Sequence, residues 1–156
     1  MAQHMTVAGA FVQIYSQGVW LSGESAVGKS ELSLELLDRG HKIIADDAIT
    51  FQVDNFGIKG FCPDTIKNLI HIRGLGLINL VSVWGKHVII PQAQLDVVVQ
   101  LERWQTPQWQ STGGLSLNKG QRQILGLSIP EYVLPVSPGR HLALLVEIII
   151  KNHLQQ

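Results

Sequence analysis

The 156-residue sequence predicts an α/β domain built on a mixed sheet with helices. Alternating apolar and polar residues, typical of strands, fill residues 6–21 and return in later segments. A glycine-rich loop leads into a helical pattern, and a second helical pattern closes the C-terminus. No repeat, charge block or long linker divides the chain, so we expect a single domain over residues 1–156.

The first part of the chain alternates strand and helix patterns. We expect two strands in residues 6–21, the second of which runs directly into the loop "GESAVGKS". The following "KSELSLELLDRG" places Leu32, Leu36 and Leu37 on one helical face, with Gly40 as the C-terminal cap. The segment "HKIIADDAITFQV" is then rich in strand-forming residues around two adjacent aspartates.

The rest of the chain is less regular. Residues 58–80 combine a short turn-and-helix segment with a stretch interrupted by glycines, and "LDVVVQLE" predicts a further strand. Residues 105–126 are polar and weakly patterned, and we expect loops with a short helix there. "EYVLPV" predicts the last strand. "GRHLALLVEIIIKNHL" predicts a helix, whose apolar positions are Leu142, Leu145, Val146, Ile149 and Ile150.

Composition argues against several classes of function. Twelve basic residues balance twelve acidic ones, which gives no electrostatic footprint for nucleic acid or an anionic membrane. The one cysteine, Cys62, can form neither an internal disulfide nor a cysteine zinc site. No apolar run reaches the roughly 18 residues of a membrane span, and the N-terminus lacks signal-peptide features. We therefore expect a cytoplasmic protein whose partners are neither nucleic acid nor membrane.

The octet "GESAVGKS" has the spacing of a Walker A phosphate-binding loop, and it lies between a predicted strand and a predicted helix. Small residues let successive backbone N–H groups converge on an anion, and the helix N-terminus adds partial positive charge. In such a loop the lysine reaches the terminal phosphates and the following hydroxyl binds Mg²⁺. The alternative is a chance match in a glycine-rich loop. The candidate nucleotide-binding residues are Gly23, Glu24, Ser25, Ala26, Val27, Gly28, Lys29 and Ser30.

Two acids follow at the end of the apolar run "KIIA". A strand that leaves the core there delivers Asp46 and Asp47 next to the loop, and neighbouring strand residues point to opposite faces. One carboxylate can then assist the metal while the other takes a proton from an attacking hydroxyl. The alternative is a solvated turn that contains two acids.

The segment "HIRGLGLINL" is an apolar stretch broken by Gly74 and Gly76 around a single arginine. It predicts either a strand with a bulge or a functional segment. In the second case Arg73 is a cation near the phosphate site, and the glycines permit close backbone approach.

Together these motifs resemble the HPr kinase/phosphorylase family. "GESAVGKSELSLELLDRGHKIIADD" resembles the loop, helix and aspartate-pair segment of that family, and "IRGLGLIN" resembles its signature stretch. "VSPGRHLALLVEIIIKN" resembles its C-terminal loop and helix. The resemblance covers about residues 6–152, the family's catalytic domain, without the N-terminal domain that many members carry.

The resemblance implies a cytoplasmic, hexameric enzyme with a fold related to phosphoenolpyruvate carboxykinase. Such enzymes use ATP and Mg²⁺ to phosphorylate a serine of HPr, a phosphocarrier of the bacterial sugar phosphotransferase system. They also remove the phosphate by phosphorolysis with inorganic phosphate. A hexamer of this chain acting on an HPr-like phosphocarrier is therefore expected.

Site residues follow from the same resemblance. Gly23 to Ser30 bind the nucleotide, and Lys29 stabilises the transferring group. Ser30 ligates Mg²⁺. From the pattern of the two adjacent acids, and not from the resemblance, we expect Asp46 to be the carboxylate that assists the metal. Asp47 accepts the proton of the serine hydroxyl and returns it in the reverse direction. The resemblance assigns Arg73 to both reactions and Arg140, in the Pro135–Arg140 loop, to phosphorolysis.

The sequence departs from the family pattern at several positions. Ala8 stands where the family has a catalytic histidine, and His71 stands where it has a metal-binding glutamate. No arginine follows Arg103 where a catalytic one is expected in residues 104–115, and Ala26 replaces a loop glycine. Three functions therefore stay open: an active protein-serine kinase, a catalytically weakened nucleotide-binding regulator of the same ancestry, and a kinase for a small metabolite.

Overall fold

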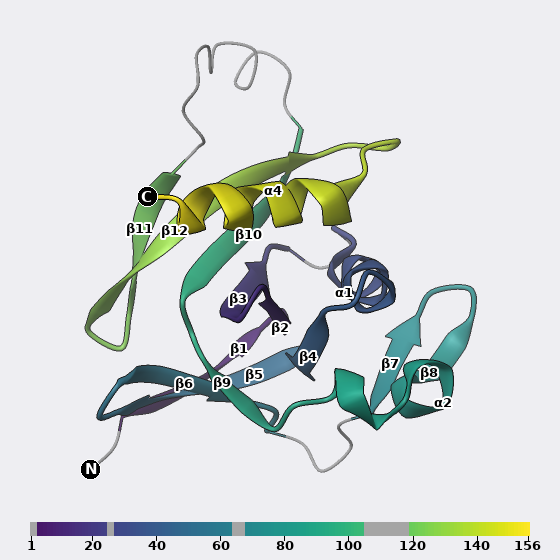
Figure 1. The fold of residues 1–156 in the computed structure, drawn as a ribbon, viewed down its shortest axis with the longest axis horizontal. Coiled ribbons are helices and arrows are strands. Elements are labelled where there is room, and N and C mark those ends of the chain that lie inside the picture. Colours follow the sequence, from purple (N-terminus) through teal and green to yellow (C-terminus); the bar gives the residue numbers. More distant parts are fainter. Residues whose placement is uncertain (1–2, 25–26, 64–67, 105–118) are drawn as a thin grey trace.

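The computed structural model describes residues 3–24, 27–63, 68–104 and 119–156 and confirms a mixed α/β fold (Figure 1). Its strands are β1 His4–Ala8, β2 Ala10–Ile14, β3 Gln17–Ser22, β4 Lys42–Ala45, β5 Ala48–Asp54, β6 Gly57–Phe61, β7 Leu69–Ile72, β8 Gly76–Asn79, β9 Gln92–Gln94, β10 Val97–Arg103, β11 Lys119–Ile124 and β12 Leu127–Val136. Its helices are α1 Lys29–Asp38, α2 Leu80–Trp84, the short 3₁₀ turn η1 Lys86–Val88, and α4 Leu142–Leu154.

The largest sheet has six strands in the order β11-β12-β10-β3-β2-β4. Its central strand β10 runs parallel to both β3 and β12, whereas the outer pairs are antiparallel, so the expected mixed sheet is confirmed. A second, antiparallel sheet has the order β1-β5-β6-β9, and β7 and β8 form a separate hairpin.

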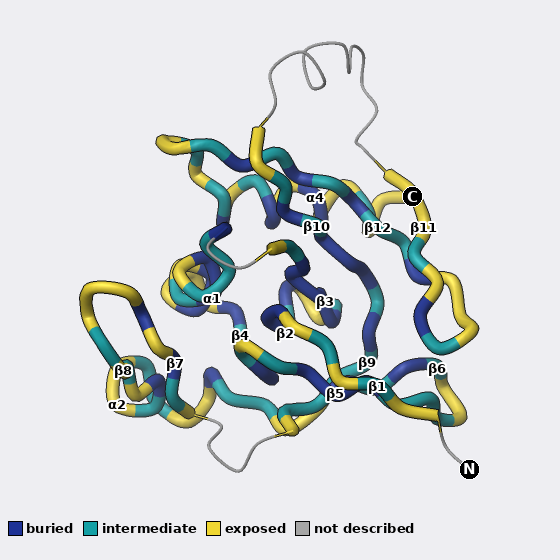
Figure 2. Tube along the Cα trace, turned by 180° about the vertical axis from the view of Figure 1, so that it is seen from behind, coloured by how far each residue is buried: buried dark blue, intermediate teal, exposed yellow. Residues whose placement is uncertain are grey.

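The six-stranded sheet is the middle layer of the fold. Helices α1 and α4 cover one of its faces, and the four-stranded sheet covers the other (Figure 1). Along β3 the side chains alternate between the two cores, because Val19 and Leu21 pack with the helices while Trp20 packs toward Phe51 of the second sheet. The buried residues accordingly gather in the central strands, and exposure rises toward the outer turns (Figure 2).

The two long helices lie as the sequence predicts. On α1, Leu32, Leu36 and Leu37 are buried. On α4, the buried positions include Val146, Ile149 and Ile150, whereas Leu142 and Leu145 are partly buried. Gly40 follows the C-cap residue Arg39 rather than being the cap, and its φ of +97° is the left-handed conformation that glycine adopts readily.

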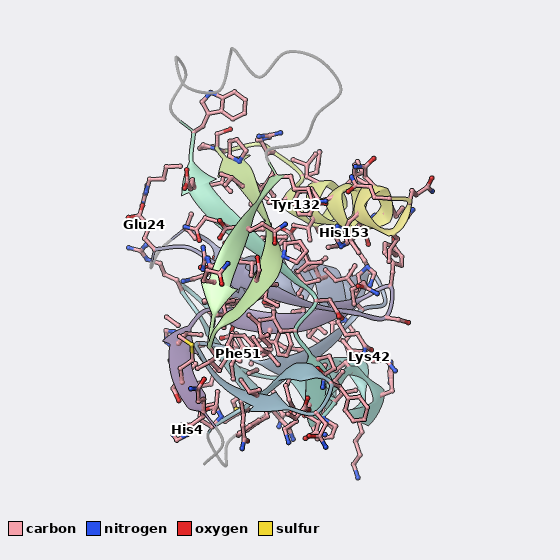
Figure 3. The ribbon with its side chains drawn as sticks, turned by 90° about the vertical axis from the view of Figure 1, so that its left-hand side faces the viewer. His4, Glu24, Lys42, Phe51, Tyr132 and His153 are labelled. Carbon is pink, nitrogen blue, oxygen red and sulfur yellow. The ribbon has the colours of Figure 1, made fainter. Side chains whose placement is uncertain are left out.

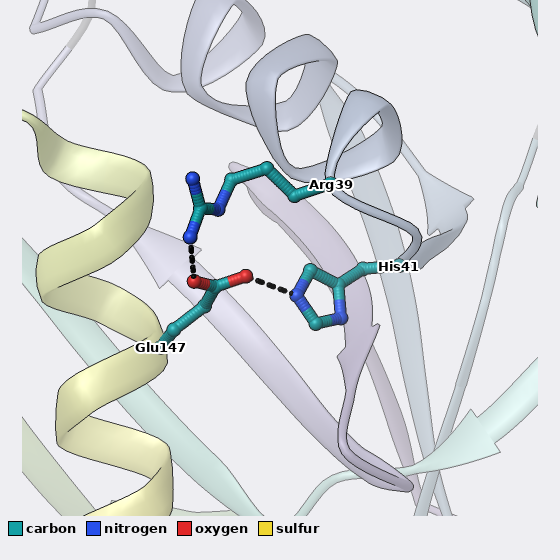
Figure 4. Close-up of polar contacts among 3 residues, drawn as sticks. All are labelled: Arg39, His41 and Glu147. Atoms are coloured by element: carbon teal, nitrogen blue, oxygen red, sulfur yellow. Dashed lines mark hydrogen bonds and ion pairs between the residues drawn. The ribbon is translucent and has the colours of Figure 1, made fainter.

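Polar contacts also attach α4 to the layer beneath it. The Tyr132 hydroxyl on β12 lies 2.7 Å from Nδ1 of His153 on α4 (Figure 3). Nearer the N-terminus of α4, the buried Glu147 accepts hydrogen bonds from Arg39 and His41, which lie between α1 and β4 (Figure 4). The sequence analysis placed no role on this second contact.

The expectation of loops over residues 105–126 was wrong at its C-terminal end. Residues 119–124 form β11, the edge strand of the main sheet, and β12 begins at Leu127, before the predicted "EYVLPV". One edge of β11 pairs with β12 and most of its side chains face solvent, so the pattern is polar although the backbone is extended. The remainder of that prediction, residues 105–118, lies outside the described residues.

Candidate phosphate-binding site

The glycine-rich loop connects the C-terminal end of the buried strand β3 to the N-terminus of α1. Gly23 has a φ of +150°, and a Cβ there would approach the Leu101 carbonyl oxygen to 2.7 Å, so a side chain is excluded. Gly28 is the N-cap of α1 at a φ of +104°. The backbone therefore turns from the sheet into the helix so that the N-terminal N–H groups of α1 face the loop. Ser25 and Ala26 lie outside the described residues.

A cavity of about 630 Å³ opens at this loop. It brings together predicted residues from three parts of the chain, namely the start of α1, the end of β4 and the tip of the β7–β8 hairpin. The lining residues are Ala8, Gly9, Gly23, Glu24, Gly28, Lys29, Ser30, Glu31, Asp46, Asp47, His71, Ile72 and Arg73. Val27, predicted to bind nucleotide, packs its side chain into the core beside the helices, which leaves its backbone as the part that can face the loop.

Lys29 and Ser30 stand at the first turn of α1 and make contacts within the cavity. Lys29 Nζ donates a hydrogen bond to the Gly23 carbonyl at 2.5 Å, across the loop. The Ser30 hydroxyl lies 3.1 and 3.2 Å from the two carboxylate oxygens of Asp46. Burial raises the pKa of Asp46 to about 6, an effect that the Ser30 hydrogen bond and the Lys29 charge only partly oppose.

Asp47, the second predicted acid, is exposed and lies in a left-handed backbone conformation with a φ of 74°. Its carbonyl accepts a hydrogen bond from the Gly9 amide at 3.2 Å. A non-glycine residue pays a local conformational cost in this region, and such residues concentrate at functional sites. The turn between β4 and β5 thus gives the two neighbouring acids different environments.

The β7–β8 hairpin supplies the opposite wall of the cavity. Gly74 and Gly76, both at a φ of +88°, form its tight turn, so the segment is a hairpin and not a bulged strand. His71 and Arg73 are exposed at the end of β7 and both line the cavity. The structure therefore brings Arg73 to the loop, as the functional alternative for this segment predicted.

Arg140, a predicted site residue, and Arg103, which was not predicted as one, are both absent from the lining of this cavity. Arg140 lines a different hollow with Glu35 and Arg39, donates to the Pro135 carbonyl at 2.7 Å, and stacks 4.9 Å from the Trp104 ring centroid. Arg103 pairs at 2.8 Å with Glu24, whose side chain projects from the surface at the loop (Figure 3). The loop acid is thus tied to the end of β10.

Gly9 and Glu31 also line the cavity, and the sequence analysis missed both. A Cβ on Gly9 would meet the Trp20 Nε1 atom at 2.5 Å, and its φ is +132°. The glycine between two short strands was the only available signal. Glu31 follows the lysine and serine of the loop motif, where a helical surface position gives no signal of its own.

Over residues 3–24, 27–63, 68–104 and 119–156, no cluster of three or more His, Cys, Asp or Glu side chains has the geometry of a metal site. In those ranges no helix combines the length and hydropathy that crossing a membrane requires.

Comparisons with known proteins all lead to one family. The model of the HPr Serine kinase C-terminal domain family matches residues 1–156. The HPr kinase/phosphorylase of Caldicellulosiruptor bescii is 39% identical over 157 residues, 100% of this chain and 50% of that protein. The HPr kinase/phosphorylase of Xanthomonas campestris pv. campestris is 40% identical over 156 residues, 99% of this chain and 49% of that protein.

A solved structure shows the same fold. The Hpr(Ser) kinase/phosphatase from Coxiella burnetii is 32% identical, with a TM-score of 0.85 over 96% of this chain and 90% of that one. The chain spans about half the length of the curated relatives that it matches.

Proposed function

The chain belongs to the HPr Serine kinase C-terminal domain family, and we propose that it transfers a phosphoryl group from ATP to a serine of HPr or of a related phosphocarrier protein. The observation that carries this proposal is one cavity that unites the loop, two carboxylates and Arg73. Phosphoryl transfer requires cations for the phosphates, oxygen ligands for a metal, and an acceptor for the proton of the nucleophile. The described lining residues supply each of these groups.

The loop from Gly23 to Ser30 is proposed to hold the nucleotide phosphates as a Walker A loop, in a fold related to phosphoenolpyruvate carboxykinase. The backbone turn at Gly23 and Gly28 supports this role, because it leaves room for an anion next to the N-terminus of α1. On nucleotide binding, Lys29 exchanges the Gly23 carbonyl for terminal phosphate oxygens. Arg73 approaches the same phosphates from the hairpin.

Ser30 and Asp46 have the chemistry of a Mg²⁺ site. Their hydroxyl and carboxylate oxygens lie 3.1 and 3.2 Å apart, and Mg²⁺ prefers such oxygen ligands together with phosphate oxygens and water. The raised pKa of Asp46 also indicates a carboxylate whose charge its neighbours do not balance. When bound, Mg²⁺ would neutralise charge on the β- and γ-phosphates.

Asp47 is proposed as the proton acceptor. The serine hydroxyl oxygen of the carrier attacks the γ-phosphorus, the bond to the ADP oxygen breaks, and the hydroxyl proton passes to the Asp47 carboxylate. The exposure of Asp47 supports this role, because a carboxylate at the mouth of the cavity can meet a serine on another protein. Asp46 is less accessible and contacts Ser30 instead.

Phosphorolysis would use the same groups in the opposite direction. An inorganic phosphate oxygen attacks the phosphorus of phosphoserine, pyrophosphate forms, and Asp47 returns a proton to the departing serine oxygen. Arg140 is proposed to act in this reaction from the loop Pro135–Arg140. Because it stacks on Trp104 outside the cavity, this role requires Arg140 to leave Trp104 when the phosphorylated carrier binds.

A nucleotide-binding regulator is the second candidate function, and two lining residues favour it. Ala8 offers no proton-transfer group at its wall of the cavity. His71 offers an imidazole, a weaker partner for Mg²⁺ than a carboxylate. Such a regulator would bind ATP and the carrier with little phosphoryl transfer.

Incubation with radiolabelled ATP, Mg²⁺ and purified HPr tests the proposal, with Lys29→Ala as the control variant. Label on the HPr serine with the native chain and none with Lys29→Ala is the expected result. Retained ATP binding without transfer would reject the kinase and leave the regulator. Absence of both binding and transfer would reject both functions.

A further inference from the structure

Arg122 lies on the edge strand β11, three strands away from the phosphate-binding loop. Strand register places it on the same sheet face as Trp20 and Ser22 of β3, the face that packs toward the four-stranded sheet. Its side chain is only 27% exposed. The sequence analysis assigned no role to it, and it lies outside the residues that line the cavity.

The guanidinium reaches across the sheet to the beginning of the loop. Its Nη1 donates to the Ser22 hydroxyl at 3.2 Å, and its Nη2 donates to the Gln100 side-chain oxygen at 2.7 Å. Ser22 is the last residue of β3, directly before Gly23, and pairs in register with Gln100. Arg122 thus cross-links the two parallel strands at the point where the loop leaves the sheet.

A second route leads from the same guanidinium to another wall of the cavity, the one formed by Ala8 and Gly9. Arg122 lies 4.9 Å from the Trp20 ring centroid in a cation–π contact. The indole N–H of Trp20 donates to the Ala8 carbonyl at 3.1 Å, and Ala8 and Gly9 line the cavity. The Trp20 ring therefore fixes this wall, and Arg122 restrains the ring.

Glu131 on β12 completes the arrangement by forming an ion pair with Arg122. Both Glu131 and Arg122 are half-buried, and the Glu131 carboxylate compensates the guanidinium charge. Two guanidinium nitrogens also donate hydrogen bonds to uncharged oxygens, those of Ser22 and Gln100. Glu131 itself is not among the residues that line the cavity. This separation allows the charge-pairing role of Glu131 to be tested apart from the contacts toward the cavity.

We propose that Arg122 is a positioning residue for the nucleotide site, acting through Ser22 on the start of the phosphate-binding loop and through Trp20 on the Ala8–Gly9 wall. This inference rests on the proposed function, because it requires that the cavity bind a nucleotide. Arg122 does not touch the cavity. It determines instead where the two walls lie before the nucleotide arrives, and so reduces the ordering cost of binding.

Calorimetric titration of Mg·ATP into native protein, Arg122→Met, Ser22→Ala and the double variant tests the inference. Methionine keeps an apolar stem against Trp20 but cannot donate a hydrogen bond. We expect Arg122→Met to raise the Kd roughly tenfold and Ser22→Ala to raise it roughly threefold. The double variant should bind no more weakly than Arg122→Met, because both changes remove the same contact.

Glu131→Gln is the matched control, since the glutamine oxygen still faces Arg122 and the two contacts toward the cavity remain. Its melting temperature should fall while its Kd for Mg·ATP stays unchanged. Native affinity in Arg122→Met with a lowered melting temperature would overturn the inference and leave Arg122 a sheet-edge stabiliser. If Arg122→Met fails to fold, native affinity in Ser22→Ala overturns it. A native chain that binds no Mg·ATP rejects the proposed function together with this inference.

Discussion

Two acids shielded from solvent, Glu147 on α4 and Asp46 after β4, have opposite electrostatic surroundings. Glu147 is 5% exposed, and its two carboxylate oxygens each lie 2.6 Å from a nitrogen, one of Arg39 and one of His41 (Figure 4). The Arg39 hydrogen bond is the main cause that holds the pKa of Glu147 below its ordinary value. Burial instead raises the pKa of Asp46 to about 6, because Ser30 and Lys29 compensate its charge only in part.

The contrast between the two carboxylates indicates two different roles: Glu147 attaches α4 to the rest of the fold, and Asp46 faces a cavity. Glu147 already has two hydrogen-bond partners within the chain, one of them the Arg39 cation, so its charge stabilises the attachment of α4 to the end of α1. Asp46 keeps a charge that the fold does not balance, next to a cavity large enough for a ligand. If Mg²⁺ binds as proposed, it compensates the charge of Asp46, whereas the Glu147 carboxylate already has Arg39 beside it.

Among the predictions, Asp47→Asn should have the largest effect, a loss in the rate of phosphoryl transfer at the cavity. If Asp47 accepts the serine proton, the rate of transfer to HPr falls about 10²–10⁴-fold, the usual contribution of a general base. The Kd for Mg·ATP should change little, because the exposed Asp47 contacts neither Ser30 nor Lys29 in the described structure. Single-turnover kinetics beside a binding titration measure both quantities. A transfer rate equal to that of the native chain would remove Asp47 from its role.

Glu147→Gln should have the next largest effect, on stability rather than on the cavity. We expect the free energy of unfolding to fall by about 2–3 kcal/mol, toward the low end for a broken buried pair because Arg39 stays 45% exposed to water. Chemical denaturation measures the loss. Nucleotide affinity of the folded fraction should equal that of the native chain.

Glu35→Gln is the control for this change, because Glu35 is an exposed acid on α1 that lies in the hollow beside Arg39. It should alter the free energy of unfolding by less than about 0.5 kcal/mol. Equal losses from the two substitutions would mean that the buried contacts of Glu147 contribute no special stability.

Asp46→Asn should do the reverse of Glu147→Gln: it should weaken ligand binding and leave stability intact. Both changes should be smaller than those predicted above. The amide keeps a hydrogen bond to Ser30 but loses the charge that Mg²⁺ requires, so the Mg²⁺-dependent part of ATP affinity should fall roughly tenfold. The free energy of unfolding without Mg²⁺ should hold or rise, because a partly desolvated charge is removed. Titrations with and without Mg²⁺ separate these contributions. A matching loss of stability would make Asp46 a second anchor.

The loop and its acids could be predicted from the sequence because their signals are local. The glycines, Lys29 and Ser30 lie within one octet, and the apolar run before Asp46 predicts a strand that ends beside it. The residues alone left two interpretations of the Arg73 segment open, and the resemblance to a family favoured the one that places Arg73 near this loop. The structure brings these groups into one cavity.

The polar contacts between distant strands and helices could not be predicted. Glu147 falls in an apolar helix, where its charge suggests an exposed position, and its partners lie over a hundred residues earlier in the chain. Arg122 lies in a segment whose polarity suggests a loop, because an edge strand buries few apolar side chains. Both residues are defined by tertiary neighbours, which composition and periodicity do not contain.

The pH dependence of stability offers the finest test of Glu147 as an anchor. Its folded-state pKa is lowered, so the stabilisation is present above the ordinary glutamate pKa of about 4.3 and is lost as pH falls through the lower, folded-state value. The groups that face Glu147 are Arg39 and His41, while Tyr15 stacks on His41 and Lys151 lies over Tyr15.

Denaturation curves from pH 5 downward should therefore show a smaller decline of stability in Glu147→Gln than in the native chain, since glutamine binds no proton in either state. Glu35→Gln should follow the native curve. Parallel curves for Glu147→Gln and the native chain would show that protonation of Glu147 is not linked to unfolding. The attachment of α4 would then depend on its apolar face, where Val146, Ile149 and Ile150 pack against the main sheet and α1.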